Sequence, residues 1–521
     1  MNPNNQTNRQ EYNYFPIKIL DNNQPNIKNQ KIILKKAEKP KKENEFKTKI
    51  VLIQQTLLKD LEGFIIVYNK LNKPHLKLDI AVYYLSLFIS LPSHYRSDEQ
   101  ENYLVRLYSL ELKEVFSNYK RYFNFFTKND IIEKPMNHST DKGTSKQYRL
   151  TDKYLFDDII GYEIKDKSLL ENIDKKNKKN EIGNYNSAID KTTLCLKKRL
   201  HLVSYFDDNL QINERLAFNI LKPFKSIKYA KYQSGMQLVL EYNKKDWKYS
   251  MKPESDNRLH TNLTRTNKEL RKCLSYKGEK LSGIDIRASQ PFFFAVFLKA
   301  LLKKDYNLIK QIGASKLITK KKFEELSNLD IDRDEIIAFV ETILTEDFYT
   351  NFSTHLEIPF DEEGKPYKMK TNYIEPKSKL TKRRRIDFEQ PKIKESFENK
   401  RDYAKSVMME VFFSSPRNTS KEAKQFRTLY PSVNKVMSFI KDNCVNLDKL
   451  LSHIESYCLL DFVALKFSKN HKNIPIWSIH DSLVTTKQNL QLLKDETEQL
   501  LSEVTTIKRD KLKDIIDIDK W

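Results

Sequence analysis

The stretch 281–298 changes in its middle from the pattern of a strand to that of a buried helix. A short apolar segment ends near Asp285 and Ile286, Ser289 is a suitable N-cap, and Pro291 fits the first turn of the strongly apolar helix that follows. Asp285 therefore stands where a strand delivers a carboxylate to the edge of a sheet. The plainer interpretation is an aspartate that caps a loop.

A second acid lies in a predicted hairpin much further along the chain. Residues 474–486 read as two short β segments that meet at His480, Asp481 and Ser482, where Asp and Ser suit a tight turn. A plain hairpin is the simpler interpretation. If its tip lay beside Asp285, the two carboxylates would repel each other unless a metal neutralised them. Two Mg²⁺ ions about 3.5–4 Å apart would then activate an attacking 3′ oxygen and stabilise a pyrophosphate leaving group.

Between these two acids, the sequence predicts a helix with a mixed stripe along one side. Arg401, Lys405, Met409 and Phe413 recur at every fourth position, so they form one slowly drifting line on a helix. Cations at its start suit a triphosphate, and the Met and Phe at its end suit a base. The simpler interpretation is a core stripe with a solvated flank.

The charge of the chain favours a polyanionic partner. Its 521 residues include 93 Lys+Arg and 70 Asp+Glu, a formal net charge of +23, while 27 Tyr and 29 Phe suffice for a core. Nucleic acid is the first candidate. We expect no membrane association, because no run approaches the roughly 18 apolar residues of a spanning helix. Four scattered cysteines without paired metal spacing favour a reducing cytoplasm.

Composition also divides the chain into parts. Residues 1–46, rich in Asn, Gln and Lys, predict a disordered basic tail. Apolar residues at helical spacing predict a mostly helical N-terminal region over 47–196, with polar linkers at 134–148 and 172–190. A basic insert at 361–394 is either a solvated loop or a contact to phosphates. It contains a run of four cations: Lys382, Arg383, Arg384 and Arg385.

In order and residue type, the three segments resemble motifs A, B and C of family A DNA polymerases and of the related phage-type single-subunit RNA polymerases. Motif A would begin at Asp285, motif B would run from Arg401 to Phe413, and motif C would be His480-Asp481-Ser482. The resemblance covers residues 200–521. Other segments are similar to ones that the family carries in the same order: Arg258-Leu-His260-Thr261 with Arg271, Glu346-Asp347-Phe348-Tyr349-Thr350, and Phe426-x₃-Tyr430-Pro431.

The resemblance implies an α+β right-hand polymerase fold, with an antiparallel palm sheet, helical fingers and thumb, and the N-terminal helical region. Residues 197–275 would form the thumb and primer–template region, and 276–521 the palm and fingers, with the fingers at about 300–445. Asp285 and Asp481 would hold two Mg²⁺ ions, with Mn²⁺ able to substitute. The carbonyl of Ile286 would be a further ligand.

The resemblance also implies a role for each remaining motif residue. Arg401 and Lys405 would hold the incoming triphosphate, and Lys405 would donate a proton to pyrophosphate. Met409 and Phe413 would lie against the incoming and templating bases, and His480 near the primer terminus. Contacts to the primer–template would come from a basic set: Arg258, Arg271, Lys382, Arg383, Arg384 and Arg385.

Two departures from the family pattern concern the sugar of the nucleotide. Gln290 stands five residues after Asp285, where the DNA polymerases usually have a Glu that blocks a ribose 2′-hydroxyl and the RNA polymerases have a Gly. Gln is large enough to block a ribose but lacks the charge, which predicts weaker discrimination. Phe413-Ser414 stands at the usual Tyr-Gly position, and a Phe cannot hydrogen-bond a ribose hydroxyl. Both departures favour deoxynucleotides.

We therefore expect a template-dependent DNA polymerase of a compact, exonuclease-less form like those of phages and mobile elements. It would act as a cytoplasmic monomer and extend a primer on a primer–template, most simply DNA, with deoxynucleoside triphosphates. Two alternatives stay open. A single-subunit RNA polymerase or primase would use ribonucleotides. A non-catalytic basic replication protein would bind DNA, with an affinity that falls steeply with salt, and incorporate no nucleotide.

Overall fold

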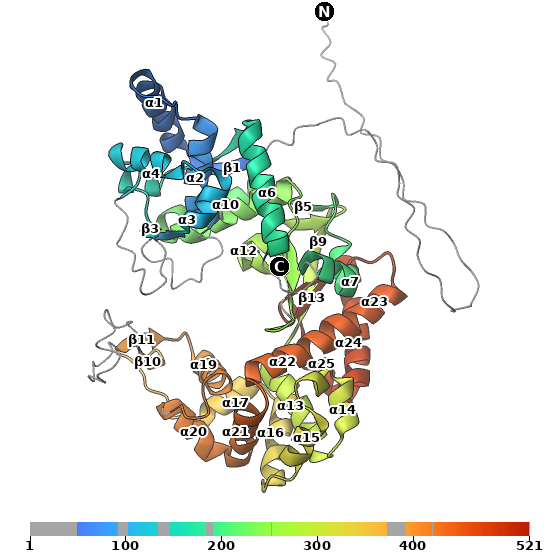
Figure 1. Ribbon diagram of the computed structural model, residues 1–521. Coiled ribbons are helices and arrows are strands. Elements are labelled where there is room, and N and C mark those ends of the chain that lie inside the picture. Colours follow the sequence, from blue (N-terminus) through green and yellow to red (C-terminus); the bar gives the residue numbers. More distant parts are fainter. Residues whose placement is uncertain are drawn as a thin grey trace, which may run out of the picture. The chain divides into compact units, whose positions relative to one another are not determined.

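The computed structural model describes residues 49–91, 103–133, 146–183, 191–251, 253–371, 392–418, 420–519 and 521. These residues form a mixed α+β fold, 59% helix and 15% strand, with a curled antiparallel sheet (Figure 1). The expected α+β class is therefore confirmed. The predicted tail over 1–46 and the basic run Lys382–Arg385 lie outside the described residues.

The N-terminal part has an apolar core of its own. Strand β1 (Lys49–Gln54) pairs antiparallel with β4 (Ile159–Ile164), and β2 (Val105–Leu107) pairs antiparallel with β3 (Lys146–Tyr148). Helices surround these two pairs: α1 (Gln55–Leu71), α2 (Leu78–Ser90), α3 (Ser109–Val115), α4 (Tyr119–Lys128), α5 (Asp152–Leu155) and α6 (Lys167–Gly183).

Helix α6 corrects one of the two linker predictions. It runs through most of the segment 172–190 that the composition assigned to a polar linker. Lys, Glu and Asn do not oppose a helix strongly, and Leu169 and Ile173 are buried and anchor its first turns. Of the other predicted linker, 146–148 form β3 and the remainder lies outside the described residues.

A middle segment leads from the N-terminal part to the sheet. Its short strands β6 (Tyr249–Met251) and β7 (Leu259–Thr261) pair antiparallel. Its helices are α7 (Lys191–Val203), α8 (Glu214–Leu221), α9 (Phe224–Ile227), α10 (Tyr229–Asn243), α11 (Asn262–Arg265) and α12 (Lys268–Arg271).

In the described part of the chain, the curled sheet has six strands, all paired antiparallel. Its central strand is β9 (Glu279–Ile286). The residues Gly283 and Ile284 pair with β13 on one edge of β9 and with β14 on the other. The other strands are β5 (Leu210–Ile212), β8 (Leu274–Tyr276), β12 (Trp477–Ile479), β13 (Ser482–Thr486) and β14 (Ile516–Asp519).

Helix α13 (Ser289–Leu302) follows β9 after a sharp turn. Phe292 to Leu298 are buried without exception, as expected for a helix that is apolar on all sides. The helix begins one residue earlier than a Ser289 N-cap requires: Ala288 takes the N-cap position in the left-handed conformation (φ 49°). The Ser289 hydroxyl donates to Glu455 instead, so the N-cap prediction was wrong because a buried carboxylate competes for this hydroxyl.

The remaining helices complete the core around α13. Among them, α13 contacts α14, α15, α16 and α22. The bounds are α14 (Tyr306–Gln311), α15 (Lys320–Ser327), α16 (Arg333–Thr345), α17 (Phe348–Thr354), α19 (Lys400–Phe413), α20 (Lys421–Leu429), α21 (Pro431–Asn443), α22 (Leu447–Ser456), the π-helix η5 (Tyr457–Val463), α23 (Ala464–Asn470), α24 (Leu490–Thr505) and α25 (Arg509–Lys513), with the hairpin β10 (Tyr367–Thr371) and β11 (Lys392–Ser396).

Helix α19 is the helix that the mixed stripe predicted. The Asn399 side chain caps its first turn by accepting from the Asp402 N–H. At its C-terminal end, Lys441 of α21 donates to the carbonyls of Val411 and Ser414 at 2.7 and 2.8 Å. Both ends of α19 are thus held by hydrogen bonds. Within the described ranges, no helix combines the length and apolar character that crossing a bilayer requires.

Candidate active site

Asp285 lies near the end of the central strand, between two neighbours that share its face. In the β9–β14 register it stands opposite Asp517, and the β9–β13 register continued by one residue sets Ser482 opposite it. Opposite residues of an antiparallel pair point to the same face. Ser482 Oγ accordingly donates to Asp285 Oδ1 at 2.9 Å. The Asp285 carboxylate, predicted at a strand end, is therefore positioned by β9 and by its two neighbours, β13 and β14.

Asp481 sits in the two-residue turn between β12 and β13, as the hairpin prediction required. The preceding residue, His480, has φ 53°, a backbone conformation that residues other than glycine adopt rarely. Ile286, the residue expected to supply a carbonyl ligand, is the last residue of β9, directly after Asp285, and pairs with Ile516 of β14.

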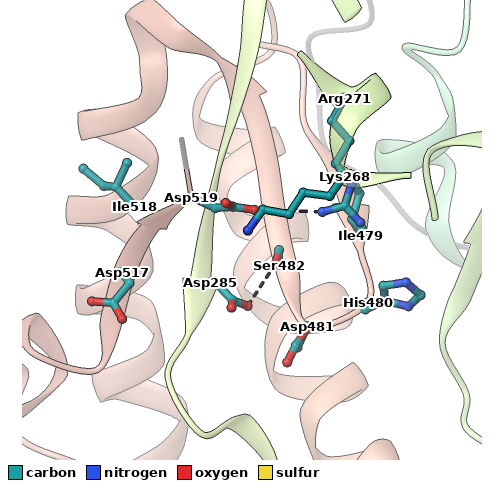
Figure 2. Close-up of a pocket in the computed structure, with 10 residues that line it drawn as sticks. All are labelled: Lys268, Arg271, Asp285, Ile479, His480, Asp481, Ser482, Asp517, Ile518 and Asp519. Carbon is teal, nitrogen blue, oxygen red and sulfur yellow. Dashed lines mark hydrogen bonds and ion pairs between the residues drawn. The ribbon is translucent and has the colours of Figure 1, made fainter. Parts of the chain in front are cut away.

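Asp285 and Asp481 line one pocket of about 330 Å³ (Figure 2). The sequence alone left their meeting open, and the structure brings them together. His480 and Arg271, both singled out from the sequence, also line it. Its full lining is Lys268, Arg271, Asp285, Ile479, His480, Asp481, Ser482, Asp517, Ile518 and Asp519.

The negative charge in this pocket is concentrated enough to shift a pKa. Burial and then the charge of Asp481 raise the pKa of Asp285 to about 6, against the hydrogen bond from Ser482, and Asp519 adds to the rise. In the described residues, no three His, Cys, Asp or Glu side chains form a ready-made metal cluster. Two carboxylates and the Ile286 backbone still suit Mg²⁺, which takes few carboxylates together with substrate phosphates and water.

Two cations from α12 lie at the same pocket. Lys268 extends over it beside Asp519 (Figure 2), and Arg271 Nη1 lies 3.9 Å from Asp519 Oδ2. The Arg271 guanidinium also lies over the ring of Trp521, 5.7 Å from its centroid. Lysine and arginine donors beside paired acids suit a ligand that carries both phosphate and metal.

Lys268, Asp517 and Asp519 were missed by sequence reasoning. The alternation Ile516-Asp517-Ile518-Asp519 was the available signal, because alternate residues of a strand face the same side. Lys268 gave no comparable signal, since it is one cation among many in a basic chain.

The ends of the α19 stripe differ from its middle. The opposite side of the helix is buried through Ala404, Val407 and Met408, whereas Lys405 is exposed and Phe413 is 49% exposed. Met409 is half-buried and packs against the core.

Arg401 is held at the start of α19 by the segment 346–350. Its Nε donates to Asp347 Oδ2 at 2.8 Å, and its guanidinium lies 5.5 Å from the ring centroid of Tyr349. Burial raises the pKa of Tyr349; Arg401 lowers it and Asp481 raises it. Tyr349 is thus within electrostatic reach of both the α19 stripe and the acid of the hairpin.

Arg258, expected to contact a primer–template, is paired with a buried acid. Its Nε donates to Glu455 Oε1 at 2.7 Å, and the same carboxylate accepts from Gln290. Glu455 is 1% exposed. Burial raises its pKa to about 7, with Arg258 opposing and Asp481 reinforcing the rise. Sequence reasoning missed Glu455, because a single Glu in a helical pattern does not differ from a solvated one.

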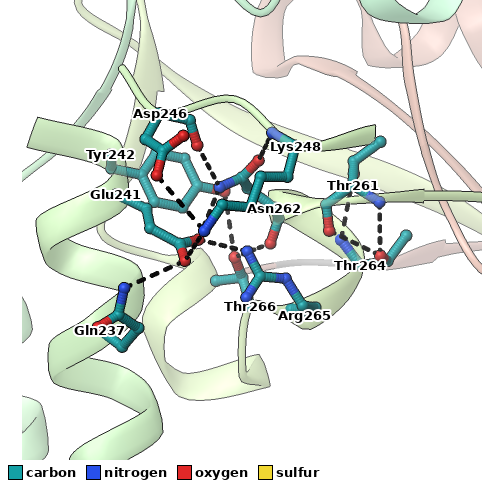
Figure 3. A network of polar contacts seen from close by, with 10 residues as sticks. All are labelled: Gln237, Glu241, Tyr242, Asp246, Lys248, Thr261, Asn262, Thr264, Arg265 and Thr266. Atoms are coloured by element: carbon teal, nitrogen blue, oxygen red, sulfur yellow. Dashed lines mark hydrogen bonds and ion pairs between the residues drawn. The ribbon is translucent and has the colours of Figure 1, made fainter. Parts of the chain in front are cut away.

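The segment after Arg258 is anchored by a second buried acid, Glu241 of α10 (Figure 3). Its carboxylate accepts from Lys248 Nζ at 2.8 Å, from Asn262 Nδ2 at 2.9 Å, and from Arg265. Burial alone would raise the pKa of Glu241, but the charges of Lys248 and Arg265 outweigh burial and lower the pKa. This network ties α10 to the β7–α11 segment.

A scan against protein-family models gives no match for this sequence, and no curated protein matches it.

We predict that Asp285→Asn stabilises the metal-free protein. In the wild-type protein, the folded pKa of Asp285, about 6, lies above its ordinary value of 3.8. The ionised carboxylate therefore destabilises the native state, and stability is lost as the pH rises through the folded value. Removal of the charge should raise the unfolding free energy by about 1–3 kcal/mol above about pH 7, and by nothing near pH 4. Denaturant titration in EDTA measures this. Asp514→Asn, an exposed aspartate outside the pocket, is the control, and an equal gain in unfolding free energy there would contradict the account.

We predict that Glu241→Ala lowers the unfolding free energy by about 3–5 kcal/mol near neutral pH, because it leaves two cations without their buried partner. Since the folded pKa is lowered, the contribution of Glu241 is present above its ordinary value of 4.5 and is lost as the pH falls through the folded value. Glu324→Ala, in an exposed pair with Lys320, should cost less than about 1 kcal/mol. Equal losses of unfolding free energy in both variants would show that the Glu241 network contributes no more stability than an exposed ion pair.

Proposed function

We propose that this chain is a template-dependent DNA polymerase that extends a primer with deoxynucleoside triphosphates by two-metal nucleotidyl transfer. The observation that carries the proposal is the pocket shared by Asp285 and Asp481. Two acids from distant segments converge there, and burial together with the charge of Asp481 raises the pKa of Asp285. A protein that only bound nucleic acid would gain nothing from paired carboxylates facing a polyanion.

In the proposed reaction, the 3′ hydroxyl of the primer loses its proton to solvent, and its oxygen forms a bond to the α-phosphorus of the nucleotide as the bond to the bridging oxygen breaks and pyrophosphate leaves. Asp285, Asp481 and the Ile286 carbonyl would hold Mg²⁺, which when bound supplies charge neutralisation at both oxygens. Ser482 keeps the Asp285 carboxylate in place through its hydrogen bond. Lys268 and Arg271, which line the same pocket, would contact phosphates of the primer–template.

The helix α19 would meet the triphosphate. Lys405 is exposed on the stripe, where it would bind the triphosphate and donate a proton to the departing pyrophosphate. Arg401 would exchange its present partner, Asp347, for phosphate oxygens. Met409 and Phe413, further along the same side, would lie against the bases.

The sheet would then be the palm of a right-hand polymerase. Residues at about 300–445 would be the fingers that carry α19, and 197–275 the thumb and primer–template region. Gln290 and Phe413 favour deoxynucleotides over ribonucleotides. Extension of one primer–template with each kind of nucleotide in parallel separates this proposal from an RNA polymerase or primase.

We predict that Asp285→Asn and Asp481→Asn each reduce primer extension by at least about 10³-fold, because each removes a ligand of the two ions. Rates of dNTP incorporation on a primed template in Mg²⁺ measure this, with thermal unfolding to confirm that each variant folds. Asp514→Asn, an exposed aspartate outside the pocket, should retain full activity. Full activity in either pocket variant would remove the two-metal assignment.

A further inference from the structure

Glu455 joins three segments that lie far apart in the sequence. It belongs to α22 and is 1% exposed. One oxygen, Oε1, accepts from Arg258 Nε at 2.7 Å and lies 2.5 Å from Arg258 Nη2 in the same ion pair. The other, Oε2, accepts from Ser289 Oγ at 2.7 Å and Gln290 Nε2 at 2.8 Å. Both oxygens are thus fully engaged, and one of them holds the first turn of α13.

Burial of the Glu455 carboxylate costs stability, so stabilisation of the fold alone is a weak explanation for its position. A buried carboxylate loses its hydration, and the charge of Asp481 makes the ionised form of Glu455 less favourable still. The start of α13 does not need a buried carboxylate, because a Ser289 hydroxyl could cap the helix by itself. The hydroxyl and the neighbouring amide are turned to Glu455 instead.

The contact fixes one orientation of the Gln290 amide. A carboxylate accepts hydrogen bonds only, so the nitrogen of the amide faces Glu455 and the oxygen faces the other way. That oxygen, Oε1, is buried and has no hydrogen-bond partner among the described residues. A glutamine side chain that is free to rotate samples many rotamers. Gln290 is limited to the rotamers that reach Glu455.

We propose that Glu455 is a positioning residue that holds Gln290 rigidly against the sugar of the incoming nucleotide and so sets the preference for deoxy- over ribonucleotides. The inference rests on the proposed function, in which Gln290 stands five residues after the metal-binding Asp285. A fixed side chain excludes a 2′-hydroxyl, whereas a mobile one swings aside and admits it. Glu455 acts through Gln290 and Arg258 and does not itself touch the nucleotide.

The test compares kcat/KM for a dNTP and for the matching NTP in single-nucleotide incorporation on one primer–template. The variants are Glu455→Leu, Gln290→Ala and the double variant. Leucine at 455 has no acceptor atom, so it cannot hold the Gln290 amide in either orientation. Glu241→Leu is the matched control, because Glu241 is equally buried and also paired with an arginine but does not contact Gln290.

We expect Glu455→Leu to lower the dNTP/NTP ratio by about 10-fold or more, mainly by raising kcat/KM for the NTP, and Glu241→Leu to leave the ratio within about twofold. The double variant should discriminate no worse than Gln290→Ala, since both changes act on one side chain. An unchanged ratio in Glu455→Leu, or additive losses in the double variant, would overturn the inference.

A second variant keeps the test decisive if Glu455→Leu does not fold. Gln290→Met retains the length of the side chain but cannot donate to Glu455, so its ratio should fall in the same way; a wild-type ratio there would overturn the inference. Failure of the proposed function is seen separately, in a wild-type protein that incorporates neither nucleotide. A wild-type enzyme that incorporates both equally well would contradict the sugar preference while leaving the polymerase proposal standing.

Discussion

The repulsion between the carboxylates of Asp285 and Asp481 is the constraint on which the rest of the candidate site depends. Two like charges in a partly buried pocket oppose folding: burial first, and then the charge of Asp481, raise the pKa of Asp285. The backbone pairing of β9 with β13 and β14 holds the acids together in spite of it. A cation would relieve the repulsion, so the arrangement makes physical sense as a site prepared for metal and phosphate.

The elements around the two acids are unusually well fixed. Buried α13 follows β9 through Ala288, and the hairpin turns through His480; both residues adopt the left-handed conformation. Such backbone strain is retained where the surrounding structure determines it, and it clusters at functional sites. The buried acid Glu455 then connects the start of α13 with Arg258 and lies within electrostatic reach of Asp481. The pocket is thus supported from the sheet, the hairpin and a second helix.

Sequence reasoning found the elements that depend on local pattern. The strand that ends near Asp285, the hairpin at Asp481 and the helix of Lys405 all follow from periodicity and turn residues, and all are present. It failed where a distant partner decides the outcome. Ser289 donates to Glu455 instead of capping its helix. The assumed linker at 172–190 is largely helix α6, because two buried apolar side chains outweigh its polar composition.

The central claim is that Asp285 and Asp481 share a pair of divalent ions in the presence of nucleotide. Mn²⁺ binding, followed by electron paramagnetic resonance, tests this in a complex with a primer that lacks the 3′ hydroxyl and the matching dNTP. The account predicts two Mn²⁺ ions per chain and the loss of at least one ion in each of Asp285→Asn and Asp481→Asn. Two ions that remain bound in both variants would contradict it.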